Sequence, residues 1–147
     1  MTNRKAFLDM IAVSEGTAAL GDNGYNVLVG GKLFRGYADH PRTVVDLPKI
    51  KIKSSAAGRY QILARYFDAY KKSLKLPDFS PASQDAIAIQ MIKECGALAD
   101  VDAGRVGVAL DKCRSRWASL PGAGYGQHEH SRDFLVSAYI KAGGVMA

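Results

Sequence analysis

The segment that most constrains the fold is residues 4–17, with the sequence RKAFLDMIAVSEGT. Four of its residues recur at the i, i+3, i+4, i+7 spacing of a buried helical face: Phe7, Met10, Ile11 and Ser14. Glu15 lies four residues after Ile11 on the same side, and Gly16 is typical of the position just past a helix end. The segment therefore predicts an N-terminal helix that packs by an apolar face and carries a carboxyl group at the end of that face.

Glu15 occupies an unfavourable place for a charged carboxylate. In the last turn of a helix the unpaired carbonyl groups and the negative end of the helix dipole oppose a negative charge. Burial opposes that charge as well, so both effects predict a raised pKa for Glu15. A carboxyl group that is neutral near pH 7 is suited to general acid catalysis. The alternative is that Glu15 points into solvent and has no chemical role.

The overall charge favours an anionic partner. The chain has 147 residues, with 20 Lys and Arg against 14 Asp and Glu, which gives a net charge of +6. Nucleic acid, a membrane surface and an acidic cell-wall polymer all fit this charge. The basic residues are scattered in ones and twos, without the run of like charges found in a nucleic-acid-binding arm. We therefore expect no nucleic-acid partner.

Length and hydropathy predict one domain over residues 1–147, large enough to fold without a cofactor. No apolar stretch reaches the roughly 18 to 20 residues of a membrane span, and Asp9 interrupts the N-terminal apolar run, so it does not read as a signal peptide. We expect a monomer with no stable membrane association that stays in the cytoplasm unless another factor releases it.

Apolar periodicity predicts a mainly helical chain with a small antiparallel sheet, an α+β fold. Residues 22–34 contain Asn-Gly and Gly-Gly turn signals around β-branched and aromatic residues, which predicts two short strands joined by a tight turn. The alternation of Lys and Ile over residues 49–53 indicates either a short exposed strand or a basic lip. Four further helices are expected over residues 63–74, 81–95, 105–117 and 131–142.

Metal and thiol chemistry find little support. The glycine-rich loop of residues 120–130 lacks the lysine of a phosphate-binding loop. It also carries His128 and His130, but no third metal ligand lies nearby in the sequence. Cys95 and Cys113 have neither CxxC spacing nor a nearby activating residue, so we expect two free thiols, no disulfide and no zinc.

Cleavage of a glycosidic bond suits one acid with nearby aromatic residues. A glycoside hydrolase normally needs a second carboxyl group, and the candidates Asp22, Asp39 and Asp46 have no compelling sequence context. One acid suffices when the substrate supplies its own nucleophile. In N-acetylmuramic acid the C6 hydroxyl can attack its own C1, so Glu15 would protonate the leaving oxygen and then accept the C6 proton.

Several segments of the chain, in order, resemble the bacteriophage lambda endolysin family, the soluble lytic transglycosylases also called lambda lysozymes. They are residues 4–10 with 14–17, 58–61, 78–86 and 117–127, and the last includes the highly specific run ASLPGAGYGQ. The resemblance implies one lysozyme-like domain over residues 1–147, whose small sheet flanks an active-site cleft. It also implies cleavage of the β-1,4 bond between N-acetylmuramic acid and N-acetylglucosamine, with a 1,6-anhydromuramic acid product and neither metal nor other cofactor.

The resemblance assigns roles residue by residue. Glu15 matches the single catalytic acid of the family, and residues 43–55 and 120–131 match two mobile lips over the glycan cleft. Six residues are expected to bind the glycan strands of peptidoglycan: Ser54, Arg59, Tyr60, Gln61, Tyr125 and Gln127. An enzyme of this family would stay in the host cytoplasm until a holin-made membrane lesion releases it to the periplasm and cell wall.

Two alternatives remain open from the sequence. One is a hydrolytic muramidase of the same fold that uses Glu15 with Asp22. The Glu, Asp and Thr spacing of phage T4-type lysozymes is not met after Glu15, which favours the transglycosylase. The other is a non-enzymatic basic domain that binds the cell wall or nucleic acid.

Overall fold

The computed structural model describes residues 2–49, 51–124 and 129–147. The chain forms two compact units. Unit 1 consists of residues 1–15 and 89–147, and unit 2 consists of residues 16–88. The two-unit organisation leaves the single-domain assignment of residues 1–147 as a prediction.

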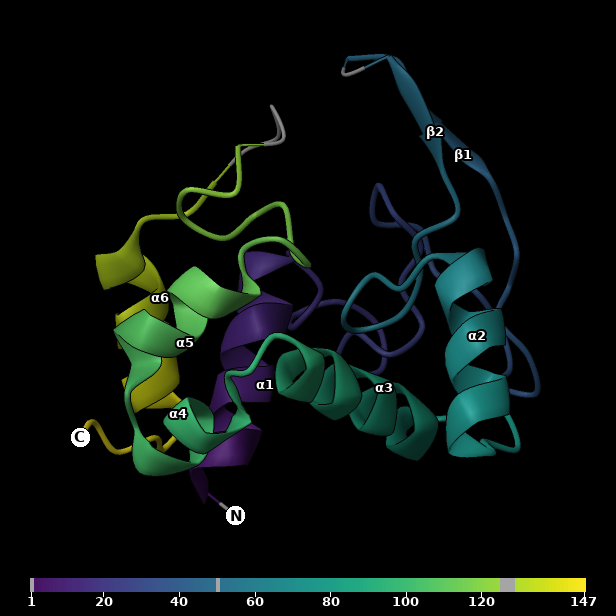
Figure 1. Cartoon of the computed structure of the whole chain (residues 1–147). Coiled ribbons are helices and arrows are strands. Elements are labelled where there is room, and N and C mark those ends of the chain that lie inside the picture. Colours follow the sequence, from purple (N-terminus) through teal and green to yellow (C-terminus); the bar gives the residue numbers. More distant parts are fainter. Residues whose placement is uncertain (1, 50, 125–128) are drawn as a thin grey trace. The chain divides into compact units, whose positions relative to one another are not determined.

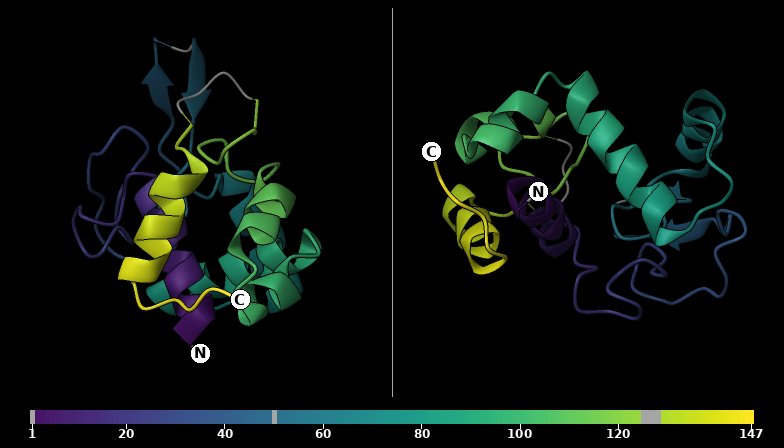
Figure 2. Two further views of the ribbon diagram at one scale, coloured as in Figure 1. Left: turned by 90° about the vertical axis from the view of Figure 1, so that its left-hand side faces the viewer. Right: turned by 90° about the horizontal axis from the view of Figure 1, so that it is seen from below.

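Unit 1 is helical. It contains α1 (Thr2–Ser14), the second half of α3 (Pro81–Glu94), α4 (Leu98–Ala103), α5 (Val106–Cys113) and α6 (Arg132–Lys141). Helix α1 packs against α6 and α4, and α5 packs against α4 and α6. Figures 1 and 2 show the yellow α6 beside the purple α1.

The apolar face predicted for the first helix is confirmed. Phe7, Met10 and Ile11 are fully buried, and Ser14 at the end of this face is buried too. The core that receives them includes apolar residues from α4, α5 and α6: Val101, Leu110, Leu135 and Tyr139. Burial of one face of α1 fixes the end of this helix, and therefore the position of the residue that follows it.

Unit 2 contains the two-stranded antiparallel sheet, α2 (Ala64–Leu74) and the first half of α3. Strand β1 (Val45–Leu47) pairs with β2 (Ile52–Ser54), with Val45 opposite Ser54 and Leu47 opposite Ile52. The two strands form a narrow hairpin that extends beyond α2 (Figure 1). A cluster of tilted and edge-on rings forms the core of this unit: Phe34, His40, Phe67 and Phe79.

The predicted sheet is in a different place from the observed one. Residues 22–34 do form a tight turn, in which Leu28 N donates to Lys32 O at 2.6 Å and Phe34 N donates to Asn26 O at 2.9 Å, but it contains only the isolated bridge between Val27 and Leu33. The strand alternative for residues 49–53 is confirmed in part, since β2 begins at Ile52 and its residues are largely exposed. A two-stranded ribbon has no second layer to cover it, which explains this exposure.

The helix boundaries agree in part with the sequence patterns. Helix α3 begins at Pro81, as predicted, and α6 begins after Ser131, whose side chain accepts a hydrogen bond from Phe134 N. Helix α5 is shorter than predicted and ends at Cys113. The six residues of α4 between Gly96 and Gly104 were not predicted, because a segment this short shows almost no periodicity.

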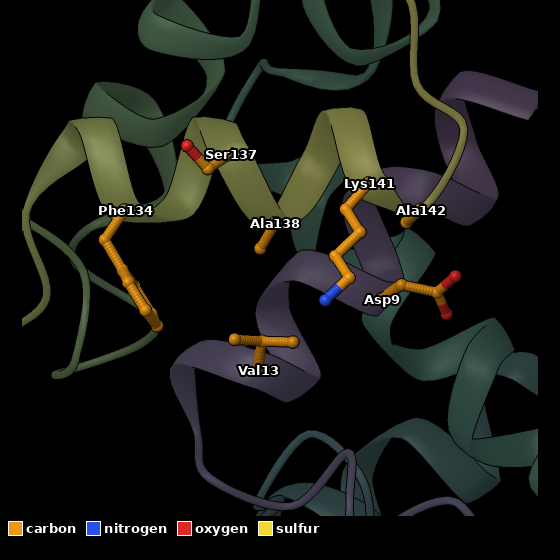
Figure 3. Close-up of a pocket in the computed structure, with 7 residues that line it drawn as sticks. All are labelled: Asp9, Val13, Phe134, Ser137, Ala138, Lys141 and Ala142. Atoms are coloured by element: carbon orange, nitrogen blue, oxygen red, sulfur yellow. The ribbon is translucent and has the colours of Figure 1, made fainter.

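A mainly apolar groove runs between α1 and α6 in unit 1. Its lining residues are Asp9, Val13, Phe134, Ser137, Ala138, Lys141 and Ala142 (Figure 3). Glu15 is not among these residues. Within the described parts of the chain, no helix combines the length and the apolar character needed to cross a membrane.

Candidate functional site

Glu15 follows α1 directly and continues its hydrogen bonding. Glu15 N donates to Ile11 O at 2.8 Å, and the chain then turns at Gly16, which has a φ of +77°. Such a positive φ favours glycine, so the helix ends here. The predicted position of Glu15 at the end of the helix is confirmed.

The carboxyl group of Glu15 is bound by one serine of unit 1, which is bound in turn by a second serine. Ser119 Oγ donates a hydrogen bond to Glu15 Oε2 at 2.5 Å, and the same Ser119 oxygen lies 2.7 Å from Ser14 Oγ. Both serines are buried, whereas Glu15 is half-buried. The carboxyl group thus has one oxygen engaged with a neutral hydroxyl.

Burial raises the pKa of Glu15 from its ordinary value of 4.5 to about 7, and the hydrogen bond from Ser119 opposes this rise. No charged group is among the causes of the shift. The upward direction predicted from the sequence is confirmed, with desolvation as the main cause. A carboxyl group with this pKa can exchange a proton near neutral pH.

His130 fixes the backbone on both sides of this carboxyl group. Its backbone N donates to Ser119 O at 2.9 Å, and its Nε2 lies 3.1 Å from Ser14 O. A carbonyl oxygen only accepts, so Nε2 must carry a proton. The ring also stacks on Phe134, with 4.9 Å between centroids. We call Ser14, Glu15, Ser119 and His130 the acid cluster.

A second acidic residue, next to His130, binds the backbone at two glycines that follow Ser119 in the chain. Glu129 accepts hydrogen bonds from the backbone N atoms of Gly122 and Gly124, at 3.0 and 2.8 Å. These bonds lower the pKa of Glu129, so its carboxylate is held in the charged form. Glu129 therefore fixes the backbone at Gly122 and Gly124.

The segment Gly58–Gln61 in unit 2 forms a tight turn closed by the pairing of Ala57 with Ile62. Gly58 has a φ of +83°, and a Cβ there would run into the buried side chain of Gln84. Gln84 Oε1 accepts from Arg59 N at 2.9 Å, and Gln84 Nε2 donates to Phe79 O at 2.9 Å. Helix α3 thus fixes the backbone of this turn, which we call the 58–61 turn.

Side chains of the 58–61 turn are held within unit 2. Tyr60 is 1% exposed and its hydroxyl donates to Asp85 at 2.6 Å, while Tyr25 donates to the same carboxylate oxygen at 2.9 Å. Arg59 Nε donates to Asn23 O at 2.9 Å, and Gln61 Nε2 donates to Gly58 O at 2.9 Å. Glycan binding by Arg59, Tyr60 and Gln61 stays a prediction, and the burial of Tyr60 gives it a structural role in supporting the turn.

The other three residues predicted to bind the glycan are Ser54, Tyr125 and Gln127. Ser54 ends β2, and its hydroxyl accepts a hydrogen bond from Ala56 N at 3.1 Å. Tyr125 and Gln127 lie outside the described residues, as does His128. The glycan-binding role of all three stays a prediction.

The candidate second carboxyl groups all lie in unit 2. Asp22 accepts a hydrogen bond from the hydroxyl of Tyr37 at 2.7 Å. Asp39 is paired with Arg42 at 2.9 Å, and Asp46 is exposed on β1. In the described chain, therefore, the hydrogen-bonding partner of the Glu15 carboxyl group is a serine and not a second acid.

Metal ligands and thiols add nothing to this site. Over the described ranges, no group of three or more His, Cys, Asp and Glu residues is arranged to hold a metal ion. Cys95 and Cys113 are free thiols, and burial raises the pKa of Cys113 to about 12. A thiol with that pKa is a poor nucleophile.

Sequence reasoning missed Ser119, His130, Gln84 and Asp85 as parts of these sites. Ser119 and Glu15 are 104 positions apart, so no local pattern could join them. For Gln84 and Asp85 a usable signal was present, because the predicted start of α3 at Pro81 places both residues in the first turns of this helix.

Comparison with known proteins gives one consistent family. A family model described as "Endolysin" matches residues 5–146. The chain is 56% identical over 147 residues to the endolysin of Escherichia phage lambda, covering 97% of this chain and 92% of that relative. It is 51% identical over 157 residues to the endolysin of Escherichia phage P2, covering 99% of this chain and 95% of that relative.

Solved structures give the same result. A bacteriophage lambda lysozyme complexed with a chitohexasaccharide matches with a TM-score of 0.96 and 54% identity, covering all of this chain and 97% of that one. Another structure of bacteriophage lambda lysozyme matches with a TM-score of 0.91 at the same identity and coverage. The lysozyme-like α+β fold predicted from the sequence is therefore confirmed.

Proposed function

Because the chain belongs to the endolysin family, and is of the lambda lysozyme type, we propose that it is a peptidoglycan lytic transglycosylase with Glu15 as its acid and base. It cleaves the β-1,4 bond between N-acetylmuramic acid and N-acetylglucosamine and leaves 1,6-anhydromuramic acid ends. The consequence of this reaction is lysis of the host cell.

One observation carries this proposal. Glu15 has a pKa raised by burial to about 7, and its carboxyl group is hydrogen-bonded to a serine, with no carboxylate among the described partners. The sequence offers no second carboxyl group with a compelling context, and hydrolysis by one acid would leave the attacking water without a general base or the glycosyl cation without a nucleophile. An intramolecular nucleophile removes that need, since an attached hydroxyl already has a high effective concentration at the reacting carbon.

The reaction proceeds in two proton transfers at one residue. Neutral Glu15 donates its proton to the glycosidic oxygen as the bond from C1 of N-acetylmuramic acid breaks. The C6 hydroxyl of the same sugar then bonds to C1, and the Glu15 carboxylate accepts the hydroxyl proton. The residue ends protonated, ready for another cycle, and no water is consumed.

The substrate follows from the family and from charge. A lambda lysozyme of closely similar structure is complexed with a chitohexasaccharide, a linear glycan. By extension, this chain binds the glycan strands of peptidoglycan, and the 58–61 turn supplies Arg59 and Gln61 as partly exposed polar side chains. The net charge of +6 favours approach to an anionic cell wall.

The hydrolytic alternative uses Glu15 with Asp22 and gives a different product. A water attacking C1 leaves a reducing end, whereas the transglycosylase leaves an anhydro end without a free reducing carbon. The non-enzymatic alternative, a basic wall-binding domain, predicts that loss of the Glu15 acid leaves function intact. Both alternatives are separated from the proposal by one experiment.

That experiment is mass spectrometry of muropeptides released from purified peptidoglycan, with Glu15→Gln as the control. The proposal predicts products one water lighter than hydrolytic ones in the wild type. It also predicts a loss of rate of about 1,000-fold or more in the folded variant, since the variant can neither donate nor accept this proton. Reducing ends would support the hydrolase, and an active Glu15→Gln variant would support the wall-binding domain.

The proposal includes the route to the cell wall. The enzyme acts as a monomer, remains in the host cytoplasm after synthesis and reaches the periplasm through a holin-made lesion. Expression of the chain alone should leave host cells intact, and co-expression with a holin should lyse them. Efficient lysis without any holin would contradict this part of the proposal.

A further inference from the structure

The hydrogen bonds of the acid cluster have a defined direction. Ser119 has one hydroxyl proton, and it is donated to Glu15 Oε2. The 2.7 Å contact between Ser119 Oγ and Ser14 Oγ must then use the proton of Ser14. The chain of donors therefore runs one way, from Ser14 to Ser119 to Glu15.

The reverse direction is disfavoured by the surroundings of Ser14. If neutral Glu15 donated through Oε2 to Ser119, Ser119 would donate to Ser14, and the Ser14 proton would need a further acceptor. In the described chain, the hydrogen bonds of the Ser14 side chain are with Ser119 alone. Ser14 is 4% exposed, so solvent does not readily supply an acceptor. A buried donor without a partner is costly, which favours the forward direction.

We propose that Ser14 and Ser119 are positioning residues whose one-way chain occupies Glu15 Oε2 and leaves the transferable proton of the neutral acid on Oε1. This inference rests on the proposed role of Glu15 as general acid. In the first step Oε1 gives its proton to the glycosidic oxygen, and in the second step the same Oε1 accepts the proton of the C6 hydroxyl. One oxygen thus performs both transfers while the other stays bound to the protein.

His130 holds the chain in place. It binds the carbonyl groups of both serine residues, through its ring N–H to Ser14 and through its backbone N–H to Ser119. Both ends of the serine pair are thereby tied to a single residue on the loop before α6. His130 is the other titratable group of the acid cluster, and Glu129 beside it is bound to the amides of Gly122 and Gly124.

The test is the pH dependence of kcat/KM on purified peptidoglycan, followed by the release of anhydro ends. The alkaline limb of this profile reports the pKa of the free enzyme's acid. Loss of the Ser119 hydroxyl removes a bond that stabilises the charged carboxylate, so in Ser119→Ala the alkaline limb should move up by about one pH unit. The variant should also lose about tenfold in kcat/KM, because the carboxyl group is no longer oriented.

Three variants make the test specific. Ser119→Thr keeps a hydroxyl and should restore the wild-type alkaline limb. Ser14→Ala leaves the bond between Ser119 and Glu15 in place but removes the hydroxyl that donates to Ser119. The alkaline limb should therefore move in the same direction by a few tenths of a pH unit. Ser73→Ala, at an exposed serine on α2, should change neither rate nor profile.

The inference is overturned if folded Ser119→Ala keeps the wild-type alkaline limb, or if folded Ser119→Thr is as impaired as Ser119→Ala. Thermal unfolding of each variant verifies that it is folded. Failure of the proposed function has a different signature, because it requires Glu15→Gln to remain active. An inactive Glu15→Gln together with an unmoved limb in Ser119→Ala would overturn the positioning role alone.

Discussion

Two carboxyl groups of unit 1, those of Asp100 and Glu15, have opposite pKa shifts and different hydrogen-bonding partners. Asp100 lies in α4 with 8% side-chain exposure and is bound by two cations, Arg105 Nε at 2.8 Å and Lys112 Nζ at 2.7 Å. Glu15 is bound by the neutral hydroxyl of Ser119. The hydrogen bonds from Lys112 and Arg105 lower the pKa of Asp100, whereas burial raises the pKa of Glu15 to about 7.

The difference shows that burial alone does not select a catalytic carboxyl group. Both carboxyl groups lose part of their solvation on folding, but only Asp100 is bound by positive charges that compensate for this loss. Glu15 is left with its desolvation cost, which is the condition for a carboxylic acid that still holds its proton near neutral pH. A buried acid without a cationic partner is therefore the better functional candidate of the two.

The largest loss of stability is expected when the charge of Asp100 is removed. Asp100→Asn removes the charge that Arg105 and Lys112 both bind, so we expect a clearly lowered denaturation midpoint at pH 7 with lytic activity retained below that midpoint. The pKa of Asp100 is lowered by folding, so its stabilisation is present above the ordinary value of 3.8 and is lost as the pH falls further. The difference from wild type should therefore shrink in acid.

Chemical denaturation at several pH values measures this effect. Asp102→Asn is the matched control, because Asp102 pairs with Arg4 at 2.7 Å but about a third of each side chain is exposed. The control should lose less stability than Asp100→Asn. Equal losses in the two variants would show that burial of Asp100 does not increase the contribution of its ion pairs to the free energy of unfolding.

A smaller effect, of opposite sign, is expected at Glu15. The pKa of Glu15 is raised by folding, so the native state is favoured at pH values below 4.5 and loses stability as the pH rises to about 7. A shift of this size corresponds to roughly 3 kcal/mol, and the partial exposure of Glu15 reduces the expected effect to about 2 kcal/mol. Glu15→Gln should therefore raise the unfolding free energy by that amount at pH 8 and change it little at pH 4.

Urea denaturation at these two pH values measures the gain. Ser73→Ala serves as the control, because it alters no titratable group and Ser73 is exposed. A Glu15→Gln variant that is equally stable to wild type at pH 8 would indicate that Glu15 is not desolvated in the folded protein.

The smallest effect is expected for a solvated ion pair of the same unit. Lys5 Nζ lies 2.8 Å from Asp9 Oδ2 at the i, i+4 spacing of α1, and the Lys5 side chain is 75% exposed. Such pairs contribute about 0.3 to 0.5 kcal/mol. Lys5→Ala should lower the unfolding free energy by no more than this in low salt, and the loss should vanish in 1 M salt. A larger, salt-independent loss would indicate packing by the Lys5 stem.

The sequence was informative where structure depends on neighbours along the chain. The buried face of α1, the end of this helix at Gly16 and the position of Glu15 could all be predicted, because helical periodicity and a terminating glycine are local signals. The start of α3 at Pro81 and of α6 after Ser131 could be predicted for the same reason.

Features that depend on distant partners could not be predicted. Ser119 reaches Glu15 from 104 positions away, and Leu28 pairs with Ala57 in addition to its bond across the tight turn that Gly30 and Gly31 suggested. Tyr60 was singled out for its side chain, yet its hydroxyl binds Asp85, 25 residues along the chain. Periodicity identifies which residues are buried, but not which residues they meet.

The most direct test of the account is a ¹³C NMR titration of the side-chain carboxyl groups in the unliganded protein, with Glu15→Gln and Asp100→Asn assigning the two signals. The account predicts that Glu15 titrates near pH 7 and that Asp100 titrates below 3.8. A Glu15 signal that titrates at its ordinary value of 4.5 or lower would contradict the account, because the residue would then be charged when the reaction needs its proton.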